Sequence, residues 1–287
     1  MPRGIDHVVH AVRDLDAAAE LYRRLGFTVG ARNIHPWGTH NRIVQLPGSY
    51  LELLTIAEPG RIPSHAPRSF SFGAFNRDFL ARREGLSMLA VEGQGAADAA
   101  RFRVAGFGNF EPFDFAREAA RPDGTPVKVA FSLAFARDPQ APDVGFFTSQ
   151  HHHPENFWNP AFQTHANTVE AIAAAILVAE NPTDHHIFLS AFVGERDVQA
   201  TSTGITVPTP RGALQVMAPT AFHVQFGVDP PDVSGGARLA GLRFAVRAFG
   251  AAVTALKEGA IDAQVRMGRI VVEPRAALGV TLVFEPA

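Results

Sequence analysis

Residues 5–12 read Ile-Asp-His-Val-Val-His-Ala-Val, and this stretch decides how the rest of the chain is interpreted. Its alternating, β-branched pattern is typical of a pleated strand. Asp14 then stands where a helix N-cap is expected, and apolar residues recur at helical spacing as far as Leu25. Gly26 follows directly, in the place where a left-handed residue commonly ends a helix. The sequence therefore begins with a predicted strand and helix.

Three short strand candidates follow this helix. Pro36, Gly38, Pro47 and Gly48 separate them and favour turns between them. The expected strands are residues 27–30, 42–46 and 50–56. The first segment is therefore a predicted βαβββ unit.

The same pattern returns three times along the chain. Val104-Ala105-Gly106-Phe107 repeats Arg24-Leu25-Gly26-Phe27 at the end of a predicted helix. The expected later elements are strands 86–91, 127–135 and 145–150 with helix 96–105, then strands 169–178, 201–207 and 213–217 with a helix from Pro182 to Gly194, then strands 242–246, 264–273 and 280–284 with helix 251–257. A spacing of about 70–85 residues identifies an internal repeat of four units.

The fold class predicted from this repeat is α+β, with four βαβββ units paired into two domains of curved mixed sheets. One unit cannot cover its own apolar surface, so units are expected to pair, with helices outside and a concave inner face. The N-terminal pair is expected in residues 1–150, a connecting loop in 151–168 and the C-terminal pair in 169–287. Alternate strand residues line the concave face, which predicts a pocket there. Residues 58–69, 154–160 and 230–236 are the expected linkers.

The composition excludes several classes of protein. The chain of 287 residues has no cysteine, so it has no disulfide scaffold and no thiolate nucleophile or ligand. The 26 basic and 28 acidic residues give a formal net charge of -2, so broad nucleic-acid binding is not expected. The apolar run 171–179 is far shorter than the roughly 20 residues of a membrane span, and no apolar signal segment opens the chain. We expect no membrane partner and a cytoplasmic location.

Several motifs of the first unit belong together. They are Asp6-His7-Val8-Val9, Asp14-Leu15-Asp16-Ala17, Leu25-Gly26-Phe27 and Tyr50-Leu51-Glu52-Leu53. With these motifs the unit resembles the vicinal oxygen chelate superfamily, which includes glyoxalase I, the fosfomycin-resistance proteins and the extradiol dioxygenases. The segments 35–41 and 150–158 resemble its glyoxalase-like subgroup.

The resemblance implies a metal site at His7 and Glu52. In the superfamily a His on the first strand and a Glu on the fourth strand of a unit bind one divalent ion (Fe, Zn, Mn or Ni), and Glu52 is then also the expected catalytic residue. Such an ion keeps open positions for a substrate with two neighbouring oxygens. The alternative is structural, with His7 hydrogen-bonded in the core and Glu52 paired with an arginine.

The other units depart from this pattern. The position that matches His7 is Met88 in the second unit and Phe244 in the fourth. The last strand of the second unit has no carboxylate to match Glu52. Further metal ligands must therefore come from elsewhere. The nearest candidates are Gln150 and His152, with His40, His151 and His153 as alternatives.

Candidate substrate-binding residues lie in loops and on one later segment. His35, Trp37, His40 and Asn41 precede the third strand, in a loop expected to lie over the first sheet, or simply in a turn. Arg117 could hold a substrate carboxylate in bidentate fashion or form a surface ion pair. Trp158 could form an apolar wall of the pocket or pack between the domains.

The leading hypothesis is a metal-dependent enzyme of the lyase or isomerase type that acts on a small molecule with vicinal oxygens. The first alternative is a metal-free protein that sequesters an apolar small molecule, which the 23 phenylalanines favour. The second is an Fe(II) extradiol-type dioxygenase, whose two-histidine, one-carboxylate ligand set is not evident in the sequence. The resemblance also implies a homodimer.

Overall fold

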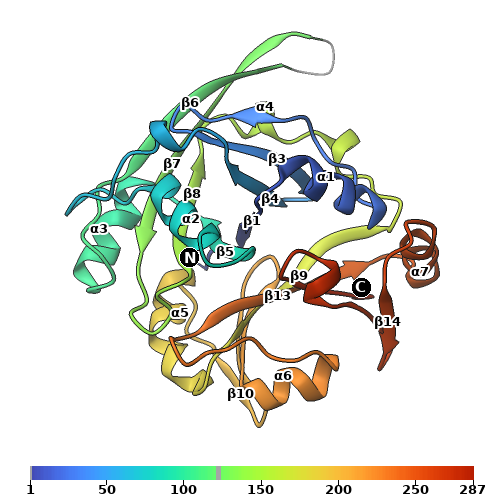
Figure 1. Ribbon diagram of the computed structural model, residues 1–287. Coiled ribbons are helices and arrows are strands. Elements are labelled where there is room, and N and C mark those ends of the chain that lie inside the picture. The colour runs from blue at the N-terminus through green and yellow to red at the C-terminus, as the bar shows by residue number, and fades with distance from the viewer. Residues whose placement is uncertain (1, 121–123) are drawn as a thin grey trace.

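The computed structural model describes residues 2–120 and 124–287, which form two eight-stranded mixed sheets (Figure 1). The strands of the first sheet are β1 (Ile5–Ala11), β2 (Asn33–Ile34), β3 (Thr39–Leu46), β4 (Ser49–Ile56), β5 (Gly85–Glu92), β6 (Phe113–Ala120), β7 (Pro126–Ala136) and β8 (Gly145–His151). Those of the second are β9 (Val169–Val178), β10 (Gln199–Thr201), β11 (Gly204–Pro208), β12 (Ala213–Met217), β13 (Arg238–Val246), β14 (Ala263–Arg266), β15 (Arg269–Val272) and β16 (Thr281–Pro286). The α-helices are α1 (Leu15–Arg24), α2 (Phe72–Leu80), α3 (Ala96–Val104), α4 (Pro154–Phe157), α5 (His186–Val193), α6 (Pro219–Phe226) and α7 (Phe249–Glu258).

The two sheets share one topology. Their strand orders are β2-β3-β4-β1-β5-β8-β7-β6 and β10-β11-β12-β9-β13-β16-β15-β14. In each sheet two units meet at an antiparallel pair, β1 with β5 and β9 with β13. The predicted α+β fold of four βαβββ units in curved mixed sheets is confirmed.

The first helix shows how local sequence produces these units. The Asp14 side chain caps α1 by accepting hydrogen bonds from the backbone N–H groups of Asp16 and Ala17, both at 2.9 Å. Gly26 follows the helix with a φ of +87°. A capping carboxylate at the start and a left-handed glycine after the end are the features from which the helix was predicted.

Some predicted elements differ from the structure. Residues 27–30 form no strand, and the edge of the sheet is β2 instead. Residues 264–273 are two strands rather than one, because Met267 and Gly268 adopt φ values of +49° and +74° and turn the chain into a hairpin. The sequence analysis also missed α2, α6 and β6.

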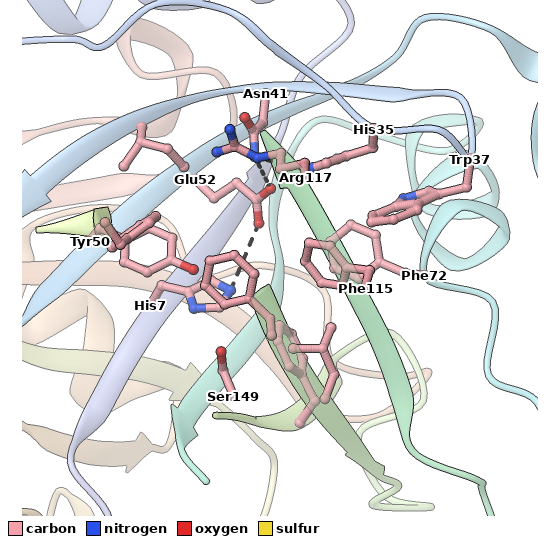
Figure 2. Close-up of a pocket in the computed structure, with 15 residues that line it drawn as sticks. His7, His35, Trp37, Asn41, Tyr50, Glu52, Phe72, Phe115, Arg117 and Ser149 are labelled. Atoms are coloured by element: carbon pink, nitrogen blue, oxygen red, sulfur yellow. Dashed lines mark hydrogen bonds and ion pairs between the residues drawn. The ribbon is translucent and has the colours of Figure 1, made fainter. Parts of the chain in front are cut away.

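Helices α2 and α6 lie on the inner faces of the sheets, where no helix was expected. In the second sheet, Phe222 and Phe226 of α6 pack with Ile176 and Val283 and fill the inner face. In the first sheet, Phe72 of α2 packs beside a cavity that the sheet encloses (Figure 2). The two halves therefore have the same topology but different interiors.

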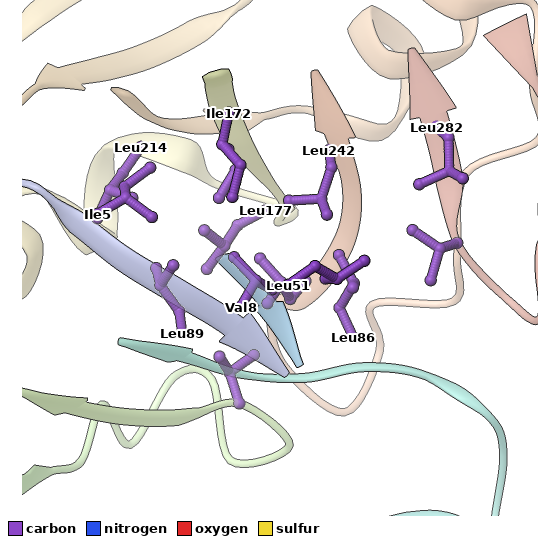
Figure 3. Close-up of a cluster of buried hydrophobic side chains, with 14 of the residues drawn as sticks. Ile5, Val8, Leu51, Leu86, Leu89, Ile172, Leu177, Leu214, Leu242 and Leu282 are labelled. Carbon is purple, nitrogen blue, oxygen red and sulfur yellow. The ribbon is translucent and has the colours of Figure 1, made fainter. Parts of the chain in front are cut away.

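The main hydrophobic core lies between the sheets. Figure 3 shows Val8 and Leu89 of the first sheet facing Leu177 and Leu242 of the second, and all four are fully buried. Helices α1, α5 and α7 contribute to the same cluster. Each fully buried leucine contributes about 1.5–3 kcal/mol relative to an exposed one, so this shared core joins the halves.

Among the described helices, none is both long enough and apolar enough to cross a membrane.

Candidate functional site

The candidate site is a cavity of about 40 Å³ inside the first sheet (Figure 2). Its polar lining comes from β1, β3, β4, β6, β8 and the loop before β3, while aromatic rings form most of its walls. The lining residues are His7, His35, Trp37, Asn41, Ile43, Tyr50, Glu52, Phe72, Phe115, Arg117, Phe131, Leu133, Phe147, Ser149 and Phe157.

The parallel pairing of β1 with β4 brings His7 and Glu52 together, as the resemblance to the superfamily implies. His7 is opposite Tyr50 and Val9 is opposite Glu52, so the two polar side chains lie on neighbouring strands. The distance from His7 Nε2 to Glu52 Oε2 is 3.8 Å, and both side chains are buried. This distance is too long for a hydrogen bond, so the two groups face each other across a gap.

Asp6 fixes the orientation of His7. Burial alone would raise the pKa of Asp6, but hydrogen bonds from His151 and His7 hold it well below its usual value. Asp6 Oδ2 is 3.1 Å from His7 Nδ1, and Asp6 Oδ1 is 2.9 Å from His151 Nε2. An ionised carboxylate only accepts hydrogen bonds, so Nδ1 of His7 donates to it. In the neutral imidazole, Nε2 is then unprotonated and faces the cavity.

Aromatic contacts hold the His7 ring in this position. The Tyr50 ring stacks on it at 4.3 Å with an interplanar angle of 12°, and Phe147 meets it edge-on at 5.2 Å. A histidine that is packed on two sides and hydrogen-bonded at Nδ1 loses little further freedom when a ligand reaches Nε2.

Glu52 is a buried carboxyl group that accepts a hydrogen bond from the Asn41 side chain. Burial raises its pKa, while His7, the Asn41 amide and Arg117 act in the opposite direction. Asn41 Nδ2 donates a hydrogen bond to Glu52 Oε1 at 2.5 Å, and Asn33 donates to Asn41 Oδ1 at 2.9 Å. One carboxyl oxygen is therefore held by the amide, and the other faces His7.

Of the four residues predicted in a loop, His35 and Trp37 lie in the loop before β3, whereas His40 and Asn41 lie on β3 itself because that strand begins earlier, at Thr39. His35 stacks on Trp37 at 4.6 Å, and its Nδ1 is 2.9 Å from the Thr39 hydroxyl. Burial, with smaller contributions from Arg117 and His40, lowers the pKa of His35 to about 3, so this ring is neutral. The Trp37 indole N–H is buried without a hydrogen-bond partner in the described part of the chain. His40 does not line the cavity, and its Nε2 lies 3.7 Å from Glu58.

Arg117 approaches the cavity from β6. Burial lowers its pKa, while Tyr50 and Glu52 raise it. Its guanidinium makes a long contact of 3.5 Å with the Glu118 carbonyl oxygen, and it forms no ion pair with a carboxylate of the described residues. The surface ion pair considered for Arg117 is thus not formed within residues 2–120 and 124–287.

Gln150 and His152 are not brought to His7 and Glu52. Because side chains alternate along β8, Ser149 lines the cavity and Gln150 lies on the other face of the sheet. There the Gln150 side chain lies against Gly95: a Cβ added to Gly95 would be 3.0 Å from Gln150 Oε1. His152 Nε2 is 2.7 Å from the Ser132 hydroxyl, also away from the cavity. Trp158 stacks on His151 at 5.6 Å, outside the lining of the cavity.

Sequence reasoning missed Asp6, Tyr50 and Ser149 as parts of the site. A register shift between Ile5 and His7 lets Asp6 contact His7 and His151, which strict alternation along the strand does not predict. Ser149, whose hydroxyl is buried without a partner among the described residues, could have been found from its spacing of two from Phe147.

The donor atoms decide whether the divalent ion implied by the superfamily fits. Two metal bonds of about 2.0–2.2 Å could span the gap between His7 Nε2 and Glu52 Oε2. However, the neighbouring strands provide no third ligand: β8 places Phe147 and Ser149 at the cavity, and β5 places Met88 in the same cluster of side chains. The second oxygen of Glu52 already accepts a hydrogen bond from Asn41. The described residues contain no group of three His, Cys, Asp or Glu side chains placed to hold a metal. Because open catalytic sites use three protein ligands, these donors do not fit a resident ion or the iron ligand set of a dioxygenase.

A larger groove of about 760 Å³ lies outside the cavity. Ile43, Arg117 and Phe157 line both spaces, so these three side chains form the partition between them. Residues 30–34 and 155–160 form two other sides of the groove, and Phe162 also lines it.

Comparisons with known proteins agree with this architecture. Residues 5–193 match the family model described as a glyoxalase-like domain. No curated protein matches the chain. A hypothetical protein from Staphylococcus aureus is similar in structure, with 10% identity, coverage of 99% of this chain and 100% of that chain, and a TM-score of 0.69.

Two further solved structures share the fold. A fusion of a xylose isomerase-like TIM barrel and 4-hydroxyphenylpyruvate dioxygenase has 12% identity and a TM-score of 0.54, over 100% of this chain and 49% of that chain. A mutant of 4-hydroxymandelate synthase from Streptomyces coelicolor has 13% identity and a TM-score of 0.53, over 99% and 92%. With the family match covering residues 5–193 and the repeated βαβββ topology, the chain belongs to the glyoxalase-like family of the vicinal oxygen chelate superfamily.

Proposed function

We propose that the protein is an enzyme of the isomerase or lyase type that moves a proton within a small molecule bearing two neighbouring oxygens, without a resident metal ion. The observation that carries the proposal is the Asp6–His7 pair, whose Nε2 faces the buried Glu52 carboxyl group at 3.8 Å inside an aromatic-walled cavity. A base and an acid facing each other in a water-poor space are suited to proton transfer.

The reaction begins at a C–H bond beside a carbonyl group, on a carbon that carries a hydroxyl. His7 Nε2 takes the proton, the C–H electron pair forms a C=C bond, and the carbonyl π pair moves to oxygen, which gives an enediolate. Asp6 stabilises the resulting imidazolium, as a carboxylate does for a catalytic histidine in general. Burial of Glu52 raises its pKa and so increases the protonated fraction that can act as an acid.

The second half of the reaction returns the proton. Glu52 protonates the former carbonyl carbon, while the hydroxyl proton moves to the oxyanion and leaves a new carbonyl group. The proton on His7 then passes to Glu52 and restores both groups. Atoms and charge balance, so this isomerisation needs no oxidant, reductant or further cofactor.

The test is exchange of the C–H hydrogen with deuterium. Chelator-treated protein in D₂O, followed by proton NMR, should catalyse exchange in a 2-hydroxy ketone, a 2-hydroxy aldehyde or a 3-hydroxy-2-oxo carboxylate. His7→Gln should slow the exchange about 10²- to 10⁴-fold, the usual contribution of a general base. Exchange that is absent in all three classes until Fe(II), Zn(II) or Mn(II) is added would contradict the metal-free proposal.

A second function is favoured by the cavity walls. Trp37, Phe72, Phe115, Phe131, Phe147 and Phe157 give the site the lining of a binding protein that sequesters an apolar ligand. Saturable binding of aromatic ligands, with no exchange or turnover of any compound in the panel, would support sequestration instead of catalysis.

A further inference from the structure

The inference concerns the positive charge in the cavity and rests on the proposed function. Arg117 is the one lysine or arginine among the described residues that line the cavity. Its guanidinium carries five N–H donors, of which one has the long 3.5 Å contact with the Glu118 carbonyl oxygen. A partly buried guanidinium with unpaired donors is a suitable binding group for an anion, which replaces the solvation lost on burial.

Two other arginines near the cavity already form ion pairs with a carboxylate of the protein. Arg32, in the outer groove, forms an ion pair of 2.6 Å with Asp16, and Arg42 binds the same carboxylate at 2.9 Å. Arg117 differs because it forms no ion pair with the described carboxylates, and its charge is directed to the space that Tyr50 and Glu52 also line. An anion that enters the cavity therefore meets Arg117.

Three further donors line the same cavity. The Ser149 hydroxyl and the Trp37 indole N–H are buried and lack hydrogen-bond partners in the described part of the chain, and the Tyr50 hydroxyl also lines the space. A tyrosine hydroxyl is protonated at neutral pH and can donate a hydrogen bond. The cavity thus offers donors to oxygen atoms from several sides, as expected of an oxyanion site.

We infer that Arg117 binds the carboxylate of the substrate and holds the charge of the enediolate, which assigns the substrates to carboxylates that carry a neighbouring carbonyl and hydroxyl, the 3-hydroxy-2-oxo carboxylates. A planar guanidinium binds a carboxylate through two parallel N–H···O bonds, and the oxygen on the next carbon is then placed toward His7 and Glu52. The positive charge of the guanidinium stabilises the negative charge on the substrate oxygens. This is the role of a metal ion in other sites, and the side chains of this cavity do not provide enough ligands for one.

The outer groove indicates where the rest of the substrate goes. Arg117 lines both the cavity and the groove, so a carboxylate bound to it is at the partition. Ile34, Trp158 and Phe162 give the groove an apolar side suited to an alkyl or aryl substituent.

Calorimetric titration of chelator-treated protein tests the inference with two isosteres, oxalate and neutral oxamide. Wild-type protein should bind oxalate at least about tenfold more tightly than oxamide, because charged hydrogen bonds contribute more than neutral ones. Arg117→Met should weaken oxalate binding by about 10- to 100-fold and leave oxamide binding unchanged. Arg117→Lys should fall between, since lysine keeps the charge but not the bidentate geometry.

The matched control is Arg247→Met directly after β13, where Arg247 pairs with Glu170 at 3.4 Å and is exposed. It should bind oxalate as wild type does, and melting temperatures of all variants should show that they are folded. Equal oxalate binding by wild type and Arg117→Met, or binding that requires added Mn(II) or Zn(II), would overturn the inference.

The outcomes also separate the inference from the proposed function. Oxalate binding that depends on Arg117, without deuterium exchange in any compound, supports the subsite and contradicts catalysis. Exchange in a neutral 2-hydroxy ketone that survives Arg117→Met supports proton transfer and contradicts the assigned substrate class.

Discussion

At the scale of single residues, the site depends on how the surroundings shift the pKa values of two carboxyl groups, Asp6 and Glu52. Asp6 accepts hydrogen bonds from two histidines, so its pKa falls despite burial, whereas burial dominates at Glu52 and its pKa rises. Two carboxyl groups with pKa values pushed in opposite directions are typical of acid–base sites. Asp6 stays ionised to orient His7, and Glu52 can carry a proton.

Asp6→Asn should therefore impair catalysis more than folding. An asparagine amide can donate to His7 Nδ1 and favour the tautomer with a proton on Nε2, which removes the base from the cavity. We expect deuterium exchange to slow by about 10²-fold or more, with its pH profile displaced. An exchange rate and pH profile equal to those of wild type would show that Asp6 does not position His7.

Glu52→Gln should change the pH dependence of stability. The folded-state pKa of Glu52 is raised, so the folded protein binds more protons than the unfolded chain above the ordinary glutamate value, and stability falls as pH rises through that window. Glutamine removes this loss. The variant should melt at a higher temperature than wild type at pH 7–8, and the difference should shrink toward pH 4.5.

The result is measured by thermal unfolding across this pH range. A constant difference in melting temperature at all pH values would indicate that the pKa of Glu52 is not raised by folding.

At the scale of elements, equivalent positions of the repeat have different surroundings. Gly26 ends α1 and Gly106 ends α3, with φ values of +87° and +77°. A Cβ on Gly26 would lie 2.9 Å from the Asn167 Cβ and 3.1 Å from the Ala255 Cβ, whereas one on Gly106 would meet nothing within 4 Å. Gly26 itself is packed against the second half of the chain, whereas the position of Gly106 faces open space.

These two glycines form a matched pair of variants. Gly106→Ala should cost about 1 kcal/mol, from the left-handed backbone alone. Gly26→Ala should cost more, because neighbouring side chains must also shift. The check is urea unfolding of both variants, and equal losses of unfolding free energy would show that the contact with Asn167 is not tight.

At the scale of the whole molecule, the core shared by the two sheets makes them one folding unit. The leucines in Figure 3 belong to both sheets and are buried against each other. Neither sheet can expose this face to water without losing the burial of many large apolar side chains. We expect one cooperative unfolding transition for the chain.

The two tryptophans provide a clean test, because Trp37 and Trp158 both lie in the first 160 residues. Leu242→Ala, in the middle of the second sheet, should destabilise the protein by about 2–5 kcal/mol and shift the unfolding curve seen by tryptophan fluorescence. Circular dichroism should report the same midpoint. A fluorescence transition that stays in place would indicate that the halves unfold separately.

Sequence patterns predicted the repeat and the α+β fold, since strand alternation, helix caps and glycines act over a few residues. The meeting of His7 with Glu52 was implied by the resemblance to the superfamily. The inner helices α2 and α6 escaped prediction. Phe72 and Phe222 are buried against sheets whose strands come from distant parts of the sequence. The local sequence of such a helix does not indicate which face of a sheet it will cover.

By itself, the sequence determined the repeated βαβββ units of this protein, and the resemblance that it carries pointed to His7 and Glu52 on neighbouring strands. The tertiary structure decided what surrounds those donors: it turned Gln150 to the far face of β8, brought Asp6 behind His7, and carried Arg117 on β6 to the lining of the cavity. The physical reason is that the charge and solvation of a buried group depend on side chains close in space, which the order of the chain does not encode locally.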